Sequence, residues 1–329
     1  MTSTQDKLSY IEQELHQLIS HCHGEISPSL YAPMAYALEG GGKRIRPLLV
    51  LLVADLYGGD YADFIQVALG LEIYHNFTLL HDDVMDNAAI RRGRPTVAAQ
   101  FGVAQAILTG DAMLSLSQDL VMRLPAPLLS PVMRVYHAMA QKIMVGQQMD
   151  MDFEHRMDVT IAEYERMILY KTAVLLSSAL EMGAYIADSG LRDRSYLVRA
   201  GINAGMAFQL RDDYLDVYGD EPTFGKPIGG DIAENKQTWL LIKAREIARQ
   251  RGELDRLQEA LALPREYREE KYRAVRAFYD AYGIPELIRG EILELSEWAL
   301  TLLSRMSNSN LEAAKNLSDL IEKMATRDL

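Results

Sequence analysis

The chain has 329 residues, of which 49% are hydrophobic, so it can bury the sizeable core of a globular protein. Its formal net charge of -12 argues against non-specific binding to nucleic acids, because their phosphates attract clustered lysine and arginine. The single cysteine, Cys22, excludes an internal disulfide, and a reducing, cytoplasmic location is therefore expected. The longest aliphatic run (48–54) is too short to span a bilayer, so no stable membrane insertion is expected.

Helical periodicity extends along almost the whole chain. Apolar residues recur every three or four positions in most windows, and the alternating runs typical of strands are scarce. The predicted helices cover residues 4–22, 28–38, 45–57, 60–87, 97–124, 128–154, 160–186, 190–219, 235–249, 252–261, 265–281, 284–305 and 308–326. No internal repeat or shift in composition divides this pattern. The sequence therefore predicts a single all-α domain, a large helical bundle over residues 1–329.

Two acidic clusters with the same D-D-x-x-D spacing are the first sign of chemistry. The first consists of Asp82, Asp83 and Asp86, and the second of Asp212, Asp213 and Asp216. Residues four apart share a helix face, and Asp83 is expected to extend the same acidic rim. Like charges about 4 Å apart repel by about 4 kcal/mol at an effective dielectric near 20, so these clusters need cations. Carboxylates favour hard ions, and both clusters are predicted to bind Mg²⁺ that bridges to phosphate.

Two basic loops complement the acidic clusters. In EGGGKRIRP (39–47), Lys43 and Arg46 follow three glycines, which let backbone N–H groups approach an anion closely. In NAAIRRGRPT (87–96), Arg91 and Arg92 follow the first acidic cluster, and arginine offers phosphate a bidentate fork. Two acidic clusters and two basic loops suit two diphosphates, one held through metal ions and one held directly by cations.

These motifs together resemble a known family. GGGKRIRP, LLHDDVMDNAAIRRGRPT, the pair Lys171-Thr172, FQLRDDYLD and GKPIGGDIAENK follow one another between residues 40 and 236. This set closely resembles the trans-prenyl diphosphate synthases, the head-to-tail polyprenyl synthetases. The resemblance implies the type I isoprenoid synthase fold, an all-α bundle around a deep central cavity, usually as a homodimer. It also implies a Mg²⁺-dependent transferase that condenses isopentenyl diphosphate with a C5, C10 or C15 allylic diphosphate.

The resemblance also implies a role for each matching residue. The six aspartates would hold three Mg²⁺ ions against the allylic diphosphate, with Asp82, Asp86 and Asp212 as direct ligands. Contacts to the allylic diphosphate are implied for Arg91, Lys171, Lys226 and Lys236, the last of which helps to close the site. Contacts to isopentenyl diphosphate are implied for Lys43, Arg46, His75 and Arg92. Thr172 and Gln209 match polar residues that face the reacting carbons.

Product length is the finest expectation. The residue five before the first aspartate often limits the cavity depth in this family, and here it is Phe77. An ideal helix places His75 and Thr78 on the face of Asp82, with Phe77 and Tyr74 displaced towards a neighbouring groove, so Tyr74 is a rival floor. Thr78 is not aromatic, unlike its counterpart in farnesyl synthases of animals. Geranylgeranyl diphosphate (C20) is the predicted main product, with farnesyl diphosphate (C15) or a longer chain as alternatives.

Other protein classes fit the sequence less well. A terpene cyclase shares the first aspartate motif, but its second metal site normally mixes Asn, Ser or Thr with Glu, whereas this chain has DDYLD. A non-catalytic partner subunit of a heteromeric transferase typically loses aspartates or basic loops, and this chain keeps both. A di-iron bundle needs paired Glu-x-x-His motifs, and Glu72 and His75 form a single such pair.

Overall fold

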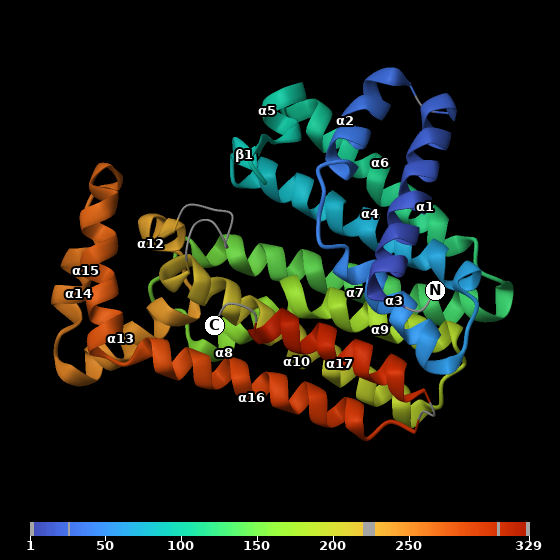
Figure 1. Ribbon diagram of the computed structural model, residues 1–329. Coiled ribbons are helices and arrows are strands. Elements are labelled where there is room, and N and C mark those ends of the chain that lie inside the picture. Colours follow the sequence, from blue (N-terminus) through green and yellow to red (C-terminus); the bar gives the residue numbers. More distant parts are fainter. Residues whose placement is uncertain (1–2, 26, 220–227, 308–309, 327–329) are drawn as a thin grey trace. The chain divides into compact units, whose positions relative to one another are not determined.

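Helices make up nearly all of the regular structure, which confirms the all-α prediction (Figure 1). The computed structural model describes residues 3–25, 27–219, 228–307 and 310–326. Its elements are α1 (Thr4–Glu25), α2 (Pro28–Leu38), α3 (Ile45–Tyr57), α4 (Tyr61–Met85), β1 (Ile90–Arg91), β2 (Arg94–Pro95), α5 (Val97–Phe101), α6 (Val103–Met122), α7 (Ala126–Phe153), α8 (Ile161–Ile168), the π-helix η1 (Leu169–Ala173), α9 (Val174–Ile186), α10 (Leu191–Tyr218), α12 (Gly230–Glu234), α13 (Trp239–Arg251), α14 (Leu254–Leu261), the 3-10 turn η2 (Arg265–Tyr267), α15 (Arg268–Ala281), α16 (Ile284–Ser304) and α17 (Leu311–Thr326).

Positive backbone φ angles explain where the helices differ from the prediction. Gly102, with φ 91°, ends α5 and divides the helix predicted at 97–124 into α5 and α6. Asn235, with φ 55°, ends α12, so the helix predicted from residue 235 begins instead at Trp239, after a side-chain cap from Thr238. A residue with positive φ cannot continue a right-handed helix, and glycine and asparagine tolerate positive φ best.

The loop at 87–96 contains a small hairpin that helical periodicity did not predict. β1 and β2 pair antiparallel, with Ile90 opposite Pro95 and Arg91 opposite Arg94. Arg92 and Gly93 form the turn with φ angles of 52° and 73°. Two successive left-handed residues match the twist of a two-residue hairpin. The turn therefore presents Arg92 at its tip.

Contacts within the chain define two compact units. Unit 1 comprises Met1–His137, Ser178–Leu197 and Met306–Leu317. Its core includes the aliphatic run at 48–54 of α3, whose side chains are nearly inaccessible to solvent. α4 packs against both α3 and α6. Residues on several faces of α4 are therefore buried, and its polar residues need specific partners.

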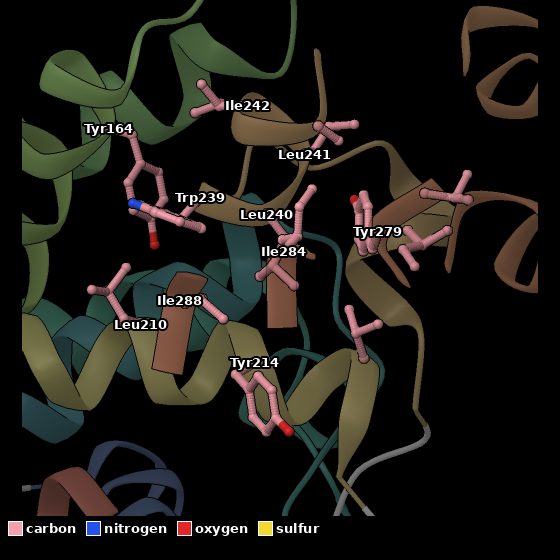
Figure 2. Packing of buried hydrophobic residues seen from close by; sticks show 14 of the residues in the cluster. Tyr164, Leu210, Tyr214, Trp239, Leu240, Leu241, Ile242, Tyr279, Ile284 and Ile288 are labelled. Atoms are coloured by element: carbon pink, nitrogen blue, oxygen red, sulfur yellow. The ribbon is translucent and has the colours of Figure 1, made fainter. Parts of the chain in front are cut away.

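Unit 2 comprises Ala138–Ser177, Val198–Arg305 and Ser318–Leu329. Its core joins aromatic and aliphatic side chains from α8, α10, α13, α15 and α16 (Figure 2). Tyr164, Trp239 and Tyr279 are buried there, and Leu210 comes from the same helix as the second acidic cluster. This core holds α10 in place. The prediction of one domain over residues 1–329 stays a prediction.

One continuous helical segment, Ile161–Ile186, has the length and hydropathy of a membrane-spanning helix. Of the window that meets this criterion, 72% is buried inside the protein. Core helices of globular proteins have the same composition, because they are apolar on all sides. The segment thus supplies core residues, and the absence of membrane insertion stays a prediction.

Candidate active site

The first acidic cluster lies at the C-terminal end of α4, in unit 1. α4 ends at Met85, and Asp86 is its C-cap, with a backbone N–H that donates to the carbonyl of Asp82. Asp86 is exposed and Asp82 is partly buried. The C-terminal end of a helix carries partial negative charge, which repels the carboxylates of Asp82 and Asp86 in addition to their repulsion of each other. This position therefore favours a bound cation.

Asp83 is the buried member of the first acidic cluster, and it shares the guanidinium of Arg91 with Asp82. It is buried, and the Nε of Arg91 donates to its Oδ1 over 2.7 Å. A second guanidinium nitrogen of Arg91 lies 3.7 Å from Asp82. Consecutive helical residues point about 100° apart. Arg91 of the hairpin supplies the positive charge that Asp83 faces. Asp82 and Asp86 thus form the outward part of the cluster.

The two basic loops, at residues 39–47 and 87–96, are in contact with each other. The guanidinium of Arg92 donates to the carbonyl of Gly41, which lies 51 residues away in the chain. A Cβ atom on Gly42 would lie only 3.1 Å from the same guanidinium. The hairpin is also held by Tyr36, whose hydroxyl donates to the carbonyl of Pro95 over 2.8 Å. Glycine therefore permits the close approach of the two loops.

His75 lies near the same cations. Burial lowers the pKa of His75 well below its usual value, and the positive charges of Arg46 and Arg92 lower it further. The imidazole is therefore neutral at pH 7 and can donate one hydrogen bond without adding charge. Lys43 is exposed on the glycine loop. The structure thus brings Arg46, His75 and Arg92 into one electrostatic neighbourhood.

The two candidates for the product-length floor are in contact. The rings of Tyr74 and Phe77 meet edge to face at 5.3 Å, and Tyr74 also meets Tyr136 of α7 at 5.5 Å. Tyr74 is 0% exposed, and its hydroxyl has no hydrogen-bond partner among the residues that the structure describes. Thr78 donates its hydroxyl to the carbonyl of His75 and so stays close to its own helix. Tyr74 and Phe77 together form one aromatic cluster.

The second acidic cluster lies on α10, in unit 2. Asp212 is partly exposed, whereas Asp213 and Asp216 are buried. Asp213 accepts hydrogen bonds from the Tyr164 hydroxyl at 2.5 Å and from the Gln209 amide at 3.2 Å. Burial raises the pKa of Asp213 to about 7, and the nearby charge of Asp231 acts in the same direction.

Asp216 accepts backbone hydrogen bonds from the segment that begins at Gly229. Its carboxylate accepts the backbone N–H of Asp231 at 3.0 Å, and its carbonyl accepts that of Gly229 at 2.6 Å. The N–H of Lys236 in turn donates to the carbonyl of Asp231. These bonds join Asp231 and Lys236 to the second cluster. Lys226 lies outside the described residues.

Lys171 and Thr172 lie in the π-helix η1, a deformation that is frequent at functional sites. The ammonium of Lys171 lies 2.5 Å from the carboxylate of Asp150. Although burial opposes ionisation of Asp150, the charges of Lys236 and Lys171 hold its pKa below the usual value. Thr172 donates to Gln209 over 2.9 Å. Unit 2 therefore unites six predicted residues: Lys171, Thr172, Gln209, Asp213, Asp216 and Lys236.

Sequence reasoning missed three side chains of this group: Asp150, Tyr164 and Asp231. Asp231 stands inside the quoted GGDIAENK motif, and its acidity beside two glycines was an available signal. Asp150 and Tyr164 stand outside every quoted motif, and their roles come from contacts made 21 and 49 residues away. Such partners become apparent only when the helices are packed.

The carboxylates fit Mg²⁺ that arrives together with a diphosphate. Among residues 3–25, 27–219, 228–307 and 310–326, no three acidic, histidine or cysteine side chains converge on one point where they could hold an ion. Mg²⁺ usually takes one or two carboxylates and completes its octahedron with phosphate oxygens and water. Asp82, Asp86 and Asp212 are accessible oxygen donors of this kind. The accessible carboxylates of each cluster, taken by itself, therefore suit Mg²⁺ shared with a substrate.

Two glycines permit helices to touch η1 at the backbone. A Cβ atom on Gly146 of α7 would lie 2.8 Å from the Cα of Lys171, and one on Gly205 of α10 would lie 2.5 Å from the Cα of Ala173. Real Cβ atoms essentially never approach backbone so closely. Both glycines therefore determine where Lys171 and Thr172 lie.

We expect Gly146→Ala to displace η1 and to lower kcat/KM by about tenfold to a hundredfold, because small misplacements of reacting groups are costly. Overpacking should also lower the unfolding free energy by about 1–3 kcal/mol. Steady-state kinetics and thermal unfolding test this. Gly290→Ala on α16 is the control, since its Cβ would meet no atom within 4 Å. Equal activity of the two variants would contradict the assigned role of Gly146.

The chain is similar in sequence and in fold to known proteins over nearly its whole length. Residues 27–281 match the polyprenyl synthetase family model. A short chain isoprenyl diphosphate synthase of Methanothermobacter thermautotrophicus is 35% identical over 98% of both chains. A geranylfarnesyl diphosphate synthase of Aeropyrum pernix is 33% identical over 89% of this chain and 92% of its own. A crystal structure of a geranylgeranyl pyrophosphate synthase superposes with a TM-score of 0.92, at 38% identity and full coverage of both chains.

Proposed function

Because the chain belongs to the polyprenyl synthetase family, we propose that it condenses isopentenyl diphosphate with an allylic diphosphate to give mainly geranylgeranyl diphosphate (C20). The protein is a short-chain prenyl transferase. One observation carries the proposed pair of substrates: the chain holds two unlike sets of anion-binding groups. One set consists of carboxylates that fit metal ions, and the other consists of Arg46 and Arg92 around a neutral His75.

The side chains have separate tasks in this proposal. Lys43, Arg46 and Arg92 bind the isopentenyl diphosphate, and neutral His75 donates a hydrogen bond without repelling the three cations. Mg²⁺, when bound, stabilises the negative charge that develops on the allylic diphosphate as it departs. Lys171 holds the same diphosphate, and Thr172 and Gln209 orient the reacting carbons.

The reaction itself requires no protein nucleophile. The allylic C–O bond breaks, and the double bond of isopentenyl diphosphate attacks the resulting cation. A proton then leaves the new chain and restores a double bond, with the released diphosphate as its acceptor. The protein contributes orientation and the exclusion of water, which would otherwise trap the cation.

Three further features belong to the proposal. Three Mg²⁺ ions per active site are expected from the two aspartate motifs. A homodimer is supported by exposed apolar side chains on α5 and α6, which a second copy would bury: Phe101, Val103, Ile107 and Leu108. A cytoplasmic location is supported by the cysteine content, because the single cysteine, Cys22, cannot form an internal disulfide and is buried in α1.

The first prediction tests the reaction and its metal. Purified protein with Mg²⁺, isopentenyl diphosphate and an allylic diphosphate should release diphosphate and yield a longer prenyl diphosphate, and EDTA should abolish this. Asp82→Ala and Asp212→Ala should each lower kcat by about a hundredfold or more, because they remove stabilisation of the departing charge. Circular dichroism should show unchanged helicity. Asp119→Ala, at an exposed carboxylate on α6, is the control. Activity that survives chelation would disprove metal dependence.

The second prediction separates the two substrates. Arg46→Ala and Lys43→Ala should raise KM for isopentenyl diphosphate by about tenfold, since a charge-assisted contact contributes about 1.5–3 kcal/mol. Lys171→Ala should instead raise KM for the allylic substrate or lower turnover. Initial rates with each substrate varied in turn measure both constants, and Arg123→Ala on the surface of α6 serves as control. Equal effects of all three substitutions on both constants would refute separate pockets.

The third prediction concerns product length. Phe77→Ala should shift the main product from C20 towards C25 or longer. It removes one ring from the aromatic cluster with Tyr74 and so leaves room for a longer chain. Chromatography of dephosphorylated products measures this shift. Tyr74→Phe is the matched control, because it removes a hydroxyl without a partner in the described structure and keeps the ring. A C15 product from the wild type would support the farnesyl alternative. Wild-type chains of C30 or longer would rule out Phe77 as the floor.

A further inference from the structure

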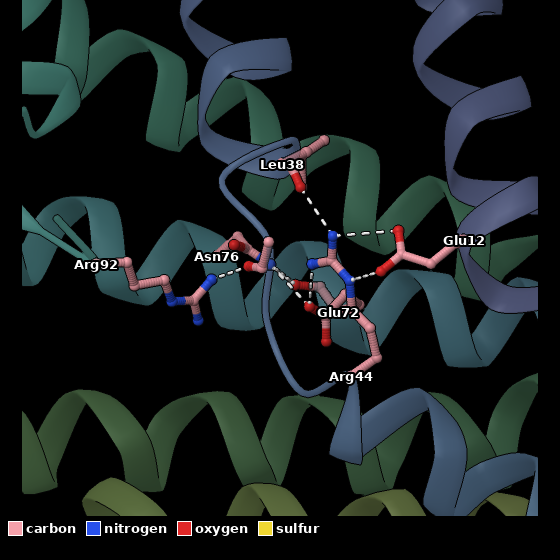
Figure 3. Close-up of polar contacts among 7 residues, drawn as sticks. Glu12, Leu38, Arg44, Glu72, Asn76 and Arg92 are labelled. Carbon is pink, nitrogen blue, oxygen red and sulfur yellow. Dashed lines mark hydrogen bonds and ion pairs between the residues drawn. The ribbon is translucent and has the colours of Figure 1, made fainter. Parts of the chain in front are cut away.

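Arg44 links three helices to the glycine loop, although it has no place in the reaction described above. It is the N-cap of α3, with left-handed φ and ψ angles of 45° and 37°, and its side chain is buried. Its guanidinium donates to Glu12 of α1 at 2.8 Å, to Glu72 of α4 at 2.7 Å and to the carbonyl of Leu38 at 2.9 Å (Figure 3). One side chain thus connects α1, the end of α2 and α4.

These bonds join the two ends of the loop that carries Lys43, because Leu38 precedes the loop and Arg44 ends it. Arg92 holds the loop between these ends, through the carbonyl of Gly41. Glu72 stands one helical turn before His75, and its carboxylate also accepts the side-chain amide of Asn76 at 3.2 Å. The ion pair between Arg44 and Glu72 therefore affects both the orientation of α4 at His75 and that of the glycine loop.

Charge compensation explains why a buried arginine is acceptable here. Burial opposes the charge of Arg44, yet the hydrogen bonds and charges of Glu12 and Glu72 raise its pKa above the usual value. Burial also lowers the pKa of Arg92, which the charge of Glu72 raises and that of Arg44 lowers. Two carboxylates around Arg44 offset its repulsion of the neighbouring cations. Each of the three bonds uses a fixed direction of the guanidinium, which a lysine ammonium cannot reproduce. Arg44 is fully engaged with protein groups and does not contribute to ligand binding directly.

We propose that Arg44 is a positioning residue for the isopentenyl diphosphate site, and that α1 supports this site through Glu12. This inference rests on the proposed function, because it assigns the substrate to Lys43, Arg46, His75 and Arg92. A loop held at both ends presents its cations in one arrangement, so less order has to be gained when the diphosphate binds. The allylic substrate should be unaffected by this support.

Two variants of the full chain test the proposal without leaving Glu72 uncompensated. Arg44→Lys keeps the charge and removes the directed bonds. Glu12→Ala removes only the outer partner, whose side chain is 41% exposed. Glu14→Ala is the control, because it removes the same charge from the same helix. Isothermal titration with isopentenyl diphosphate alone gives the dissociation constant, since no condensation occurs without an allylic partner, and initial rates give both KM values.

Both test variants should weaken binding of isopentenyl diphosphate by about threefold to tenfold, a range usual for residues that act through others. KM for isopentenyl diphosphate should rise equally, while KM for the allylic substrate and kcat stay within about twofold. Unchanged binding, or equal rises in both KM values, would overturn the proposal and leave Arg44 a purely structural residue. A wild type that fails to bind isopentenyl diphosphate would instead refute the proposed function.

Discussion

The repulsion between like charges on largely buried helices is the constraint on which the other features of both units depend. α4 and α10 each carry three aspartates between apolar residues, and neither helix can turn all of them to solvent. Each unit meets this constraint by giving its buried carboxylates hydrogen-bond or charge partners, such as the N–H of Asp231 for Asp216. Asp83 faces Arg91, and Asp213 accepts hydrogen bonds from Tyr164 and Gln209. The more accessible carboxylates, Asp82, Asp86 and Asp212, can be reached by a cation that a substrate brings.

Backbone contact is the second means of arranging the site. Lys171 and Thr172 lie on a π-helix rather than on a regular turn, and the helices beside them carry glycine at the points of contact. Lys171 and Thr172 are consecutive, so their side chains point in different directions: Lys171 meets Asp150, whereas Thr172 meets Gln209. The glycines let the neighbouring helices come close enough for both contacts to form.

The sequence predicted those features that depend on spacing along one helix. The apolar repeat located nearly all the helices, and the D-D-x-x-D spacing located both acidic clusters. The hairpin was missed because two-residue strands have no periodicity and Arg92 is an unusual residue for a left-handed turn. The buried position of Asp83 was missed because it depends on Arg91, eight residues away on another element. Likewise, the side chain of Arg44 bonds to residues up to 32 positions away.

The left-handed conformation of Arg92 has a consequence for evolution of the protein. A two-residue hairpin turn of this kind favours Asn-Gly or Asp-Gly, and a longer side chain at the first position carries backbone strain of about 1 kcal/mol or more. Asparagine at this position would relieve that strain and would remove a cation of the candidate site. Selection for a more stable fold and selection for diphosphate binding therefore oppose one another at this single turn. Homologues that have lost activity would be free to drift towards the more relaxed turn.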